Sequence, residues 1–165
     1  MNGANIYRAT DADIEALATN MRAADRKEML QWTGQDALWA VRLSVRQSDS
    51  CYVGYADDGQ LLCAFGAKRD NLIERTAIIW ELSTEAVNTH KIAFLRNSRE
   101  CFDRLCRDLS DVEEFHNWVS AEYTGAVRWI EWLGGALSID FRKKGLCGGD
   151  FRFFYIENPH YKEDN

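Results

Sequence analysis

The feature that most constrains the fold is a change of residue periodicity in the middle of the chain. Three apolar runs follow one another closely, at 51–55, 61–67 and 76–82. Short polar bends separate them, the first of which is an Asp-Gly turn, so the pattern predicts three consecutive antiparallel strands. Apolar residues then recur at helical spacing over 92–109, and a further strand is predicted at 115–121. A strand, a long helix and another strand imply a right-handed crossover, and therefore one parallel pair inside an otherwise antiparallel sheet.

The chain before this block predicts one strand and two helices. Residues 6–9 form the strand, and Thr10 then caps a helix whose first turn carries two Asp residues, where carboxylates favour the positive end of the helix dipole. A second helix is predicted over 37–45. The segment 28–34 between the two helices fits neither period and is ambiguous.

The last part of the chain predicts a short helix over 125–133, ended by Gly134, and two strands at 136–141 and 151–156. The complete order is β-α-α-β-β-β-α-β-α-β-β. This order indicates an α/β (α+β) fold with a mixed, mostly antiparallel central sheet flanked by helices. Nothing in the sequence marks a linker or a repeat, so we expect a single domain over 1–165.

Charge and composition exclude several classes of function. The 165 residues include 20 Lys and Arg against 26 Asp and Glu, a formal net charge of −6, which opposes binding to nucleic acid or to an anionic membrane. No apolar run approaches the roughly 20 residues of a membrane span, and the N-terminus lacks a secretory signal. The five cysteines form no Cys-x-x-Cys pair. We therefore expect a soluble cytoplasmic protein with free thiols.

Three short segments carry a resemblance to a known family: IYRATDADI at 6–14, NWV at 117–119 and WIEWLGGA at 129–136. With the order of elements, they resemble the GNAT superfamily of N-acetyltransferases over essentially the whole chain. The resemblance implies that fold, acetyl-CoA as cofactor and an amine as acceptor. More narrowly, WELS at 80–83 and the NWV strand are similar to GNAT-like proteins of podophages, among them internal virion proteins. That narrower resemblance implies a phage protein, in the host cytoplasm or the virion.

The segment that would hold the cofactor departs from the family pattern. In the superfamily, the strand before the long helix splays from its neighbour, and a loop Arg/Gln-x-x-Gly-x-Gly/Ala brings backbone N–H groups to the diphosphate of acetyl-CoA. The corresponding stretch 83–93 contains no glycine, and Glu85 adds a negative charge there. The candidate cofactor-binding residues implied by the match are Ser83, Asn88, Thr89, His90, Lys91 and Ile92.

The family's proton donor is also missing at its expected place. Many members carry a Tyr in the second-last helix whose hydroxyl can protonate the departing thiolate. The match places Ile130 there, and Tyr123, before the helix, is the nearest phenol. Glu81 on the strand before the long helix is the candidate general base. The ordinary alternative, which the sequence favours, is that Glu81 faces solvent or pairs with an Arg at the end of a strand.

Other patterns predict no further chemistry. The three histidines have no ligand spacing, so no metal site is expected, and a polar or capping role is expected for His90. The basic run 142–144 is interpreted as a charged turn between antiparallel strands. Six tryptophans in a chain of this size also allow an exposed protein-binding surface beside ordinary core packing.

Two functions of different class follow from the sequence. The first, slightly preferred because of the missing glycines and Tyr, is a phage accessory protein, a degenerate acyltransferase that acts as an interaction scaffold with a protein partner in internal virion assembly. The second is an acetyl-CoA-dependent N-acetyltransferase with a divergent cofactor loop, in which amides around 88–92 hold the diphosphate and Glu81 activates an amine. A different small ligand between the splayed strands is a third alternative. The sequence does not identify the oligomeric state.

Overall fold

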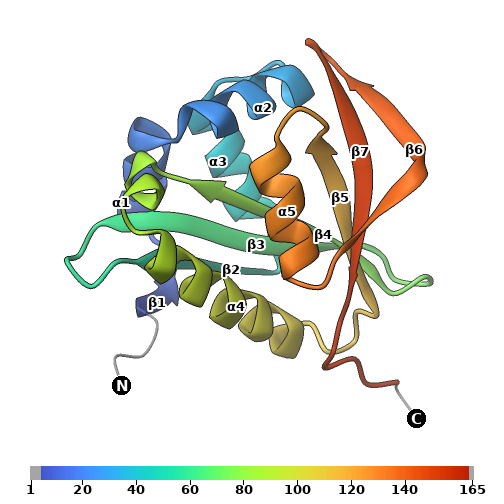
Figure 1. The fold of residues 1–165 in the computed structure, drawn as a ribbon. Helices are drawn as coiled ribbons and strands as arrows, with labels where there is room; N and C mark the ends of the chain where they lie inside the picture. The colour runs from blue at the N-terminus through green and yellow to red at the C-terminus, as the bar shows by residue number, and fades with distance from the viewer. Residues whose placement is uncertain (1–4, 164–165) are drawn as a thin grey trace.

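A computed structural model describes residues 5–163 as one seven-stranded sheet with helices on both faces (Figure 1). The strand order is β1-β2-β3-β4-β5-β7-β6, and every neighbouring pair is antiparallel except β4 and β5. The strands are β1 Asn5–Arg8, β2 Ser50–Tyr55, β3 Leu61–Asn71, β4 Thr76–Ser83, β5 Glu114–Ser120, β6 Ala136–Gly145 and β7 Gly148–Glu157. The mixed sheet with its single parallel pair is confirmed.

The helices form two layers, one on each face of the sheet. They are α1 Asp11–Asn20, α2 Ala23–Thr33, α3 Ala37–Gln47, the 3₁₀ helix η1 Glu85–Asn88, α4 Lys91–Asp108 and α5 Thr124–Trp132. One apolar cluster joins α1 and α3 to the sheet, and another joins α4 and α5 to its other face. Within the described residues, none of the helices is long and apolar enough to cross a membrane.

The predicted start of α1 is confirmed in detail. The Thr10 hydroxyl accepts a hydrogen bond from the Asp13 amide at 3.3 Å, and the Asp13 carboxylate accepts one from the Thr10 amide at 2.8 Å. This reciprocal capping box satisfies two amides that the first helical turn leaves free. It fixes the point at which the chain leaves β1 and crosses over the sheet.

The predicted order is wrong in one respect, because three α-helices rather than two precede β2. The additional helix is α2, which includes most of the ambiguous segment 28–34. Its inward side chains are Asp25, Glu28, Met29 and Trp32, at helical spacing. Two of these four are carboxylates, so the segment lacks the apolar stripe by which amphipathic helices are recognised.

The basic run 142–144 was predicted as a turn, and this is also wrong. These residues lie within β6, where Arg142 pairs with Arg152 and Lys144 with Asp150 of β7. The turn comes later, at Leu146 and Cys147, because Gly145 and the positive-φ Gly148 allow a two-residue connection at that point. The basic side chains therefore belong to a strand that lies beside α2.

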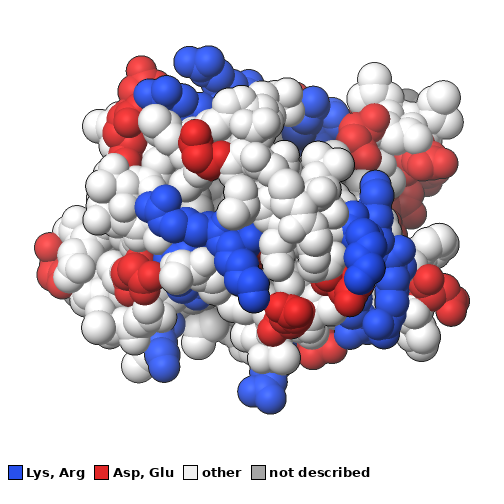
Figure 2. Space-filling model, turned by 90° about the horizontal axis from the view of Figure 1, so that it is seen from above, with Lys and Arg blue, Asp and Glu red and all other residues white. Residues whose placement is uncertain are grey.

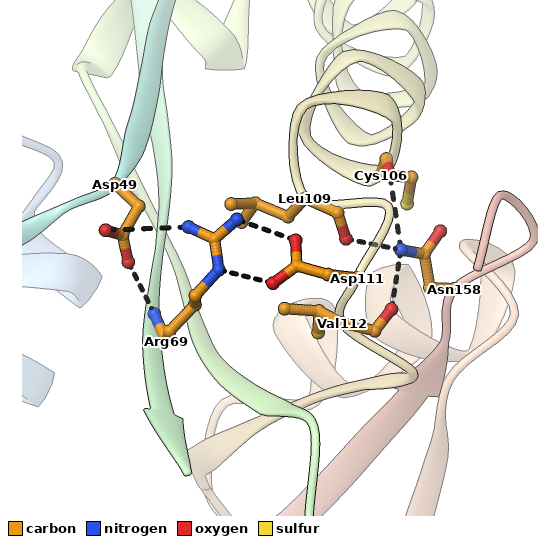
Figure 3. A network of polar contacts seen from close by, with 7 residues as sticks. All are labelled: Asp49, Arg69, Cys106, Leu109, Asp111, Val112 and Asn158. Carbon is orange, nitrogen blue, oxygen red and sulfur yellow. Dashed lines mark hydrogen bonds and ion pairs between the residues drawn. The ribbon is translucent and has the colours of Figure 1, made fainter. Parts of the chain in front are cut away.

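Side-chain hydrogen bonds fix the C-terminal end of α4 (Figure 3). The amide nitrogen of Asn158, which follows β7, lies 3.2 Å from the Cys106 carbonyl oxygen, 3.0 Å from that of Leu109 and 2.8 Å from that of Val112. Helix ends leave such carbonyls without intrahelical partners.

The loop between α4 and β5 is held to β3 by an ion pair. Arg69 of β3 holds Asp111 with two bonds of 2.7 Å, and its amide donates to Asp49 at 2.7 Å (Figure 3). A bidentate pair of this kind fixes orientation as well as distance. Together with Asn158, these contacts position β5 beside β4.

Candidate functional site

The central feature of the site is the separation of the parallel strands β4 and β5. They pair only from Thr76 to Ile78 on β4 and from Glu114 to His116 on β5. The side chain of Asn117 bridges the next position: its amide nitrogen donates to the Ile79 carbonyl at 2.7 Å, and its oxygen accepts the Trp118 N–H at 2.8 Å. A side-chain amide thus replaces a backbone bond where the two strands begin to diverge.

Two carboxylates of α2 hold the far ends of the diverging strands. Asp25 accepts the Ser83 N–H of β4 at 2.7 Å, and Glu28 accepts the Ser120 N–H of β5 at 2.7 Å. Arg22 completes this end, because its N–H donates to the Ser83 carbonyl at 2.9 Å and its guanidinium lies 3.0 Å from Asp25. Helix α2 therefore closes the open end of the gap with groups that replace the missing strand partners.

Between Asn117 and α2, backbone groups are left facing the gap. The N–H and C=O of one strand residue point to the same side, and alternate residues repeat that direction. Since the Ile79 carbonyl points toward β5, the N–H and C=O of Glu81 do so too, and the Trp118 carbonyl faces them from β5. No partner for these three groups occurs among the residues that the structure describes.

A cavity of about 420 Å³ occupies the gap. Its wall on the α4–α5 side is largely apolar and aromatic, and Asn88 and Lys91 also contribute to the lining. Its wall on the α2 side is charged and aromatic. The α4–α5 wall includes Val87, Phe94, Leu95, Ala126, Trp129 and Ile130, and the α2 wall includes Arg22, Asp25, Glu28, Met29, Trp32 and Trp118.

Glu81 lies in this cavity rather than at a solvated strand end, in contrast to the interpretation that the sequence favoured. Burial raises the pKa of Glu81 to about 8, and the nearby charge of Asp25 adds to the rise. The Ser83 hydroxyl donates a hydrogen bond to its carboxylate. A carboxyl group with this pKa exchanges its proton close to neutral pH, as a general base must.

The two carboxyls of α2 share this environment. Burial raises the pKa of Glu28 to about 7, although the bond from the Ser120 amide opposes the rise. Burial also raises the pKa of Asp25, against the Arg22 guanidinium beside it. The three carboxyls line the cavity. The face seen from above carries Lys and Arg interspersed with Asp and Glu rather than one continuous acidic patch (Figure 2).

Tyr123 is the residue before α5 and lines the same cavity as Glu81. Burial and the Asp25 carboxylate raise the pKa of Tyr123 well above its ordinary range, so the phenol stays protonated. The Arg22 guanidinium lies 5.3 Å from the centre of its ring. Ile130, at the position matched to the family's Tyr, is 3% exposed and belongs to the apolar wall.

The six predicted cofactor-binding residues are not brought together as one set. Asn88 and Lys91 line the cavity, whereas Thr89 and Ile92 are exposed and outside its lining. The backbone of Ser83 is occupied by the contacts with α2 described above. His90 precedes α4. Its ring lies 3.1 Å from the Gln60 side chain and 3.3 Å from Asp58, both of which belong to the turn between β2 and β3.

The N-terminus of α4 offers amides to an anion. The first amide with an intrahelical acceptor is that of Phe94, and His90 gives no side-chain cap. Within the described residues, the N–H groups of Lys91, Ile92 and Ala93 have no acceptor. Amides of this kind, at the positive end of the helix dipole, form an anion site without any glycine.

Glu85 does not oppose an anion as strongly as its sequence position predicts. Its carboxylate accepts the Ala23 N–H at the start of α2 at 2.9 Å and the Asn88 side-chain amide at 2.7 Å. The charge is therefore directed at the positive end of another helix, where it is stabilised.

The sequence reasoning missed Arg22, Asp25 and Glu28 as site residues, and missed the bridging role of Asn117. The signal for α2 was available: Asp25, Glu28, Met29 and Trp32 follow the helical spacing i, i+3, i+4, i+7. A helix with acids among its inward positions indicates a polar cavity beneath it. Among residues 5–163, no group of three or more His, Cys, Asp or Glu side chains is placed to hold a metal ion.

No protein-family model and no curated protein matches the sequence. Solved structures match it over nearly its whole length at low identity. Phosphinothricin acetyltransferase of Sinorhizobium meliloti, a GNAT superfamily protein in complex with AcCoA, superposes with a TM-score of 0.70 and 13% identity over 99% of this chain and 93% of that chain. Spermidine N-acetyltransferase of Vibrio cholerae, in complex with CoA and spermine, has a TM-score of 0.68 and 14% identity over 96% and 97%.

A third neighbour is the ribosomal-protein-S18-alanine N-acetyltransferase of Escherichia coli, with a TM-score of 0.65 and 10% identity over 98% of both chains. The three neighbours are acetyltransferases by name, and their likeness to this chain is one of architecture. The protein therefore has the GNAT fold of acyl-CoA N-acyltransferases, and the fold class predicted from the sequence is confirmed. The narrower resemblance to podophage proteins stays a prediction.

Proposed function

We propose that this protein is an acyl-CoA-dependent N-acyltransferase, with acetyl-CoA as the donor. The observation that carries the proposal is the gap between β4 and β5, which holds a cavity and presents unpaired backbone groups of Glu81 and Trp118 to it. A closed sheet with this topology would leave no room for a ligand between its strands. The gap is held open by Asn117 at one end and by α2 at the other.

The residues present fit acetyl-CoA in two respects. Its pantetheine arm carries two amide groups, which can pair with the exposed N–H and C=O of strand residues as a neighbouring strand would. Its diphosphate suits the free amides of Lys91, Ile92 and Ala93 at the N-terminus of α4, with the Lys91 ammonium beside them. The apolar wall of α4 and α5 would exclude water from the chain between these points.

Two side chains that line the cavity supply acid and base. Acetyl-CoA provides the acyl group as a reactive thioester. Glu81, with a pKa of about 8, takes a proton from the acceptor's ammonium group or from the amine as it forms its new bond. Tyr123, whose raised pKa keeps it protonated, donates a proton to the leaving sulfur. The carboxyls of Asp25 and Glu28 favour a positively charged acceptor.

The proposal is tested by calorimetric titration of acetyl-CoA into wild type and two variants at Ile92. This side chain is 83% exposed, so substitution leaves the core intact. Ile92→Glu places a carboxylate in the first turn of α4, which stabilises the helix but opposes a diphosphate. We expect micromolar binding by wild type, about tenfold weaker binding by Ile92→Glu, and wild-type binding by Ile92→Gln. Absence of wild-type binding at millimolar acetyl-CoA would refute the proposal.

The same titration decides the alternative drawn from the sequence, an interaction scaffold in internal virion assembly. That hypothesis depends on the glycine-free segment 83–93, for which the free amides of α4 provide another route to a diphosphate. A chain that binds no acetyl-CoA but retains the fold would favour the scaffold. A protein partner, a phage origin and a location in the host cytoplasm or virion stay predictions.

A further inference from the structure

A lysine of the β6–β7 hairpin lies over two tryptophans of the cavity wall. Trp32 of α2 and Trp118 of β5 stack with ring centres 6.0 Å apart and planes inclined by 27°. The ammonium nitrogen of Lys143 lies 5.5 Å from the centre of the Trp32 ring and 5.7 Å from that of Trp118. Both distances are within the range of cation–π attraction. Both tryptophans line the cavity and Lys143 does not, so the lysine marks a cation position beside the part of the cavity wall that the two rings form.

The hairpin that carries this lysine is held against α2 at its tip. The Cys147 N–H donates to the Gln31 carbonyl at 2.9 Å. A Cβ added to Gly145 would lie 2.3 Å from the same carbonyl oxygen, so the two backbones approach as closely as glycine permits. The next lysine along the strand, Lys144, pairs with Asp150 at 2.6 Å instead. The position of Lys143 over the tryptophans therefore follows from how the hairpin is attached.

One ring of the aromatic pair, Trp32, and the two carboxyls of α2 lie along one helix face. Glu28 precedes Trp32 by four residues and Asp25 precedes it by seven, which places them about 6 Å and about 10 Å from it along the helix axis. A molecule with one ammonium group among the carboxyls can therefore extend a second cationic group to the two rings. A monoamine of the same length would leave that second place to Lys143.

We propose that Trp32 and Trp118 form a subsite for a second cationic group of the acceptor, and that Lys143 fills this subsite until the acceptor displaces it. The inference rests on the proposed function and names its substrate class: a diamine or a longer polyamine. The lysine side chain is exposed and held by an attraction that is weak at exposed sites, so an incoming ammonium group that also reaches the carboxyls displaces it.

The test measures amine binding by calorimetry without acetyl-CoA, so that its result is independent of cofactor binding. The probes are diaminobutane, diaminohexane and diaminooctane, each compared with the monoamine of the same carbon number. We expect the best diamine to bind about tenfold more tightly than its monoamine, a ratio that corresponds to about 1.4 kcal/mol. Equal affinities across all three pairs would overturn the inference.

Variants of the hairpin and of the rings give the test its specificity. Lys143→Met removes the resident cation and should tighten diamine binding about threefold without changing monoamine binding. The matched control, Lys144→Met, should change neither. Trp32→Leu should abolish the preference for the diamine. If Lys143→Met and Lys144→Met had equal effects, the hairpin would act only through its total charge and the subsite would be refuted.

Failure of this inference and failure of the proposed function give different experimental results. A chain that binds and acetylates amines but does not distinguish diamines from monoamines keeps the function and loses the subsite. A chain that binds no acetyl-CoA loses the function, whatever its affinity for amines. Since Lys143 is exposed, its variants remain informative even if Trp32→Leu does not fold.

Discussion

The two walls of the cavity are built on different principles. The wall of α4 and α5 is made of apolar side chains at helical spacing, such as Phe94 and Ile130, which also form the core of that layer. The wall of α2 includes Asp25 and Glu28, which hold strand amides. The first wall obtains its position from hydrophobic burial and the second from hydrogen bonds. One wall is thus an extension of an apolar core, and the other is a polar wall, at which the proposed function places the acceptor.

The largest expected effect is at Glu81, between the two walls. Glu81→Gln keeps the shape of the side chain and its bond to Ser83 but cannot accept a proton from the acceptor. We expect kcat to fall at least about 100-fold, within the usual range for loss of a general base, while the Kd for acetyl-CoA stays the same. Steady-state kinetics with a diamine and titration of the cofactor measure the two quantities.

A control for this variant is Glu131→Gln on the exposed side of α5. It should leave kcat within about twofold of wild type. A Glu81→Gln protein with full kcat would assign the base to the α2 wall, to Glu28 or Asp25.

The pH profile gives the next largest effect. With a pKa of about 8 for Glu81, kcat/KM should rise with pH and level off above 8, so that activity at pH 7 is about a tenth of the plateau. A profile that is flat from pH 6 to pH 9 would contradict the role of Glu81.

The free energy of unfolding should change with pH in the direction opposite to activity. The folded state raises the pKa of Glu81 from 4.5 to about 8 and that of Glu28 from 4.5 to about 7, so it binds protons that the unfolded chain releases. The contribution of these two groups to the free energy of unfolding is therefore largest below pH 4.5, and it falls as the pH rises toward 8. Denaturant titrations of wild type and Glu81→Gln between pH 5 and pH 8.5 should show the smaller decline in the variant.

A smaller effect is expected from Glu28→Gln, which removes a charge from the α2 wall. The glutamine oxygen can still accept the Ser120 N–H, so the strand end stays in place. We expect KM for an amine acceptor to rise about fivefold and the Kd for acetyl-CoA to stay the same. An equal loss for acetyl-CoA and amine would show that the two walls do not divide the ligands as proposed.

The smallest effect is expected at Asn117, which bridges β4 and β5 where the two strands begin to diverge. Asn117→Ala leaves the Ile79 carbonyl and the Trp118 N–H without partners, which should lower the free energy of unfolding by about 1 to 3 kcal/mol. The control Asn20→Ala, at the exposed end of α1, should stay within about 0.5 kcal/mol of wild type. Chemical denaturation measures both. An Asn117→Ala protein as stable as wild type would mean that the gap needs no bridge.

The sequence predicted the elements whose buried side is apolar. The crossover through α4 is an example, because Phe102 and Leu105 repeat at helical spacing and lie in the core. It did not predict α2, whose inward residues include acids, nor the last part of β6 at 142–145, whose three basic residues and glycine give no apolar alternation. Periodicity reports burial against an apolar neighbour, and elements that border a polar cavity lack that signal.

The candidate site was predictable only in part. Glu81 and Tyr123 were named from the sequence, and the structure places both in one cavity. The bond from Asn117 to Ile79 could not be foreseen, because it joins residues 38 positions apart at a place where two strands fail to pair. The raised pKa values of Glu81 and Tyr123 could not be predicted for the same reason, because the burial that raises them depends on distant parts of the chain that cover the site.

The attachment of α4 has a mechanical consequence. The Asn158 side chain holds the carbonyl of Cys106 in its last turn and those of Leu109 and Val112 just beyond it. The first three amides of the helix, beside the cavity, have no acceptor among the described residues. Hydrogen bonding of α4 is therefore unequal at its two ends: the end remote from the cavity is bonded to the chain that follows β7, and the end beside the cavity keeps unused donors. A diphosphate bound at those donors would supply the acceptors that the chain lacks, so that both ends of the helix would be restrained by hydrogen bonds.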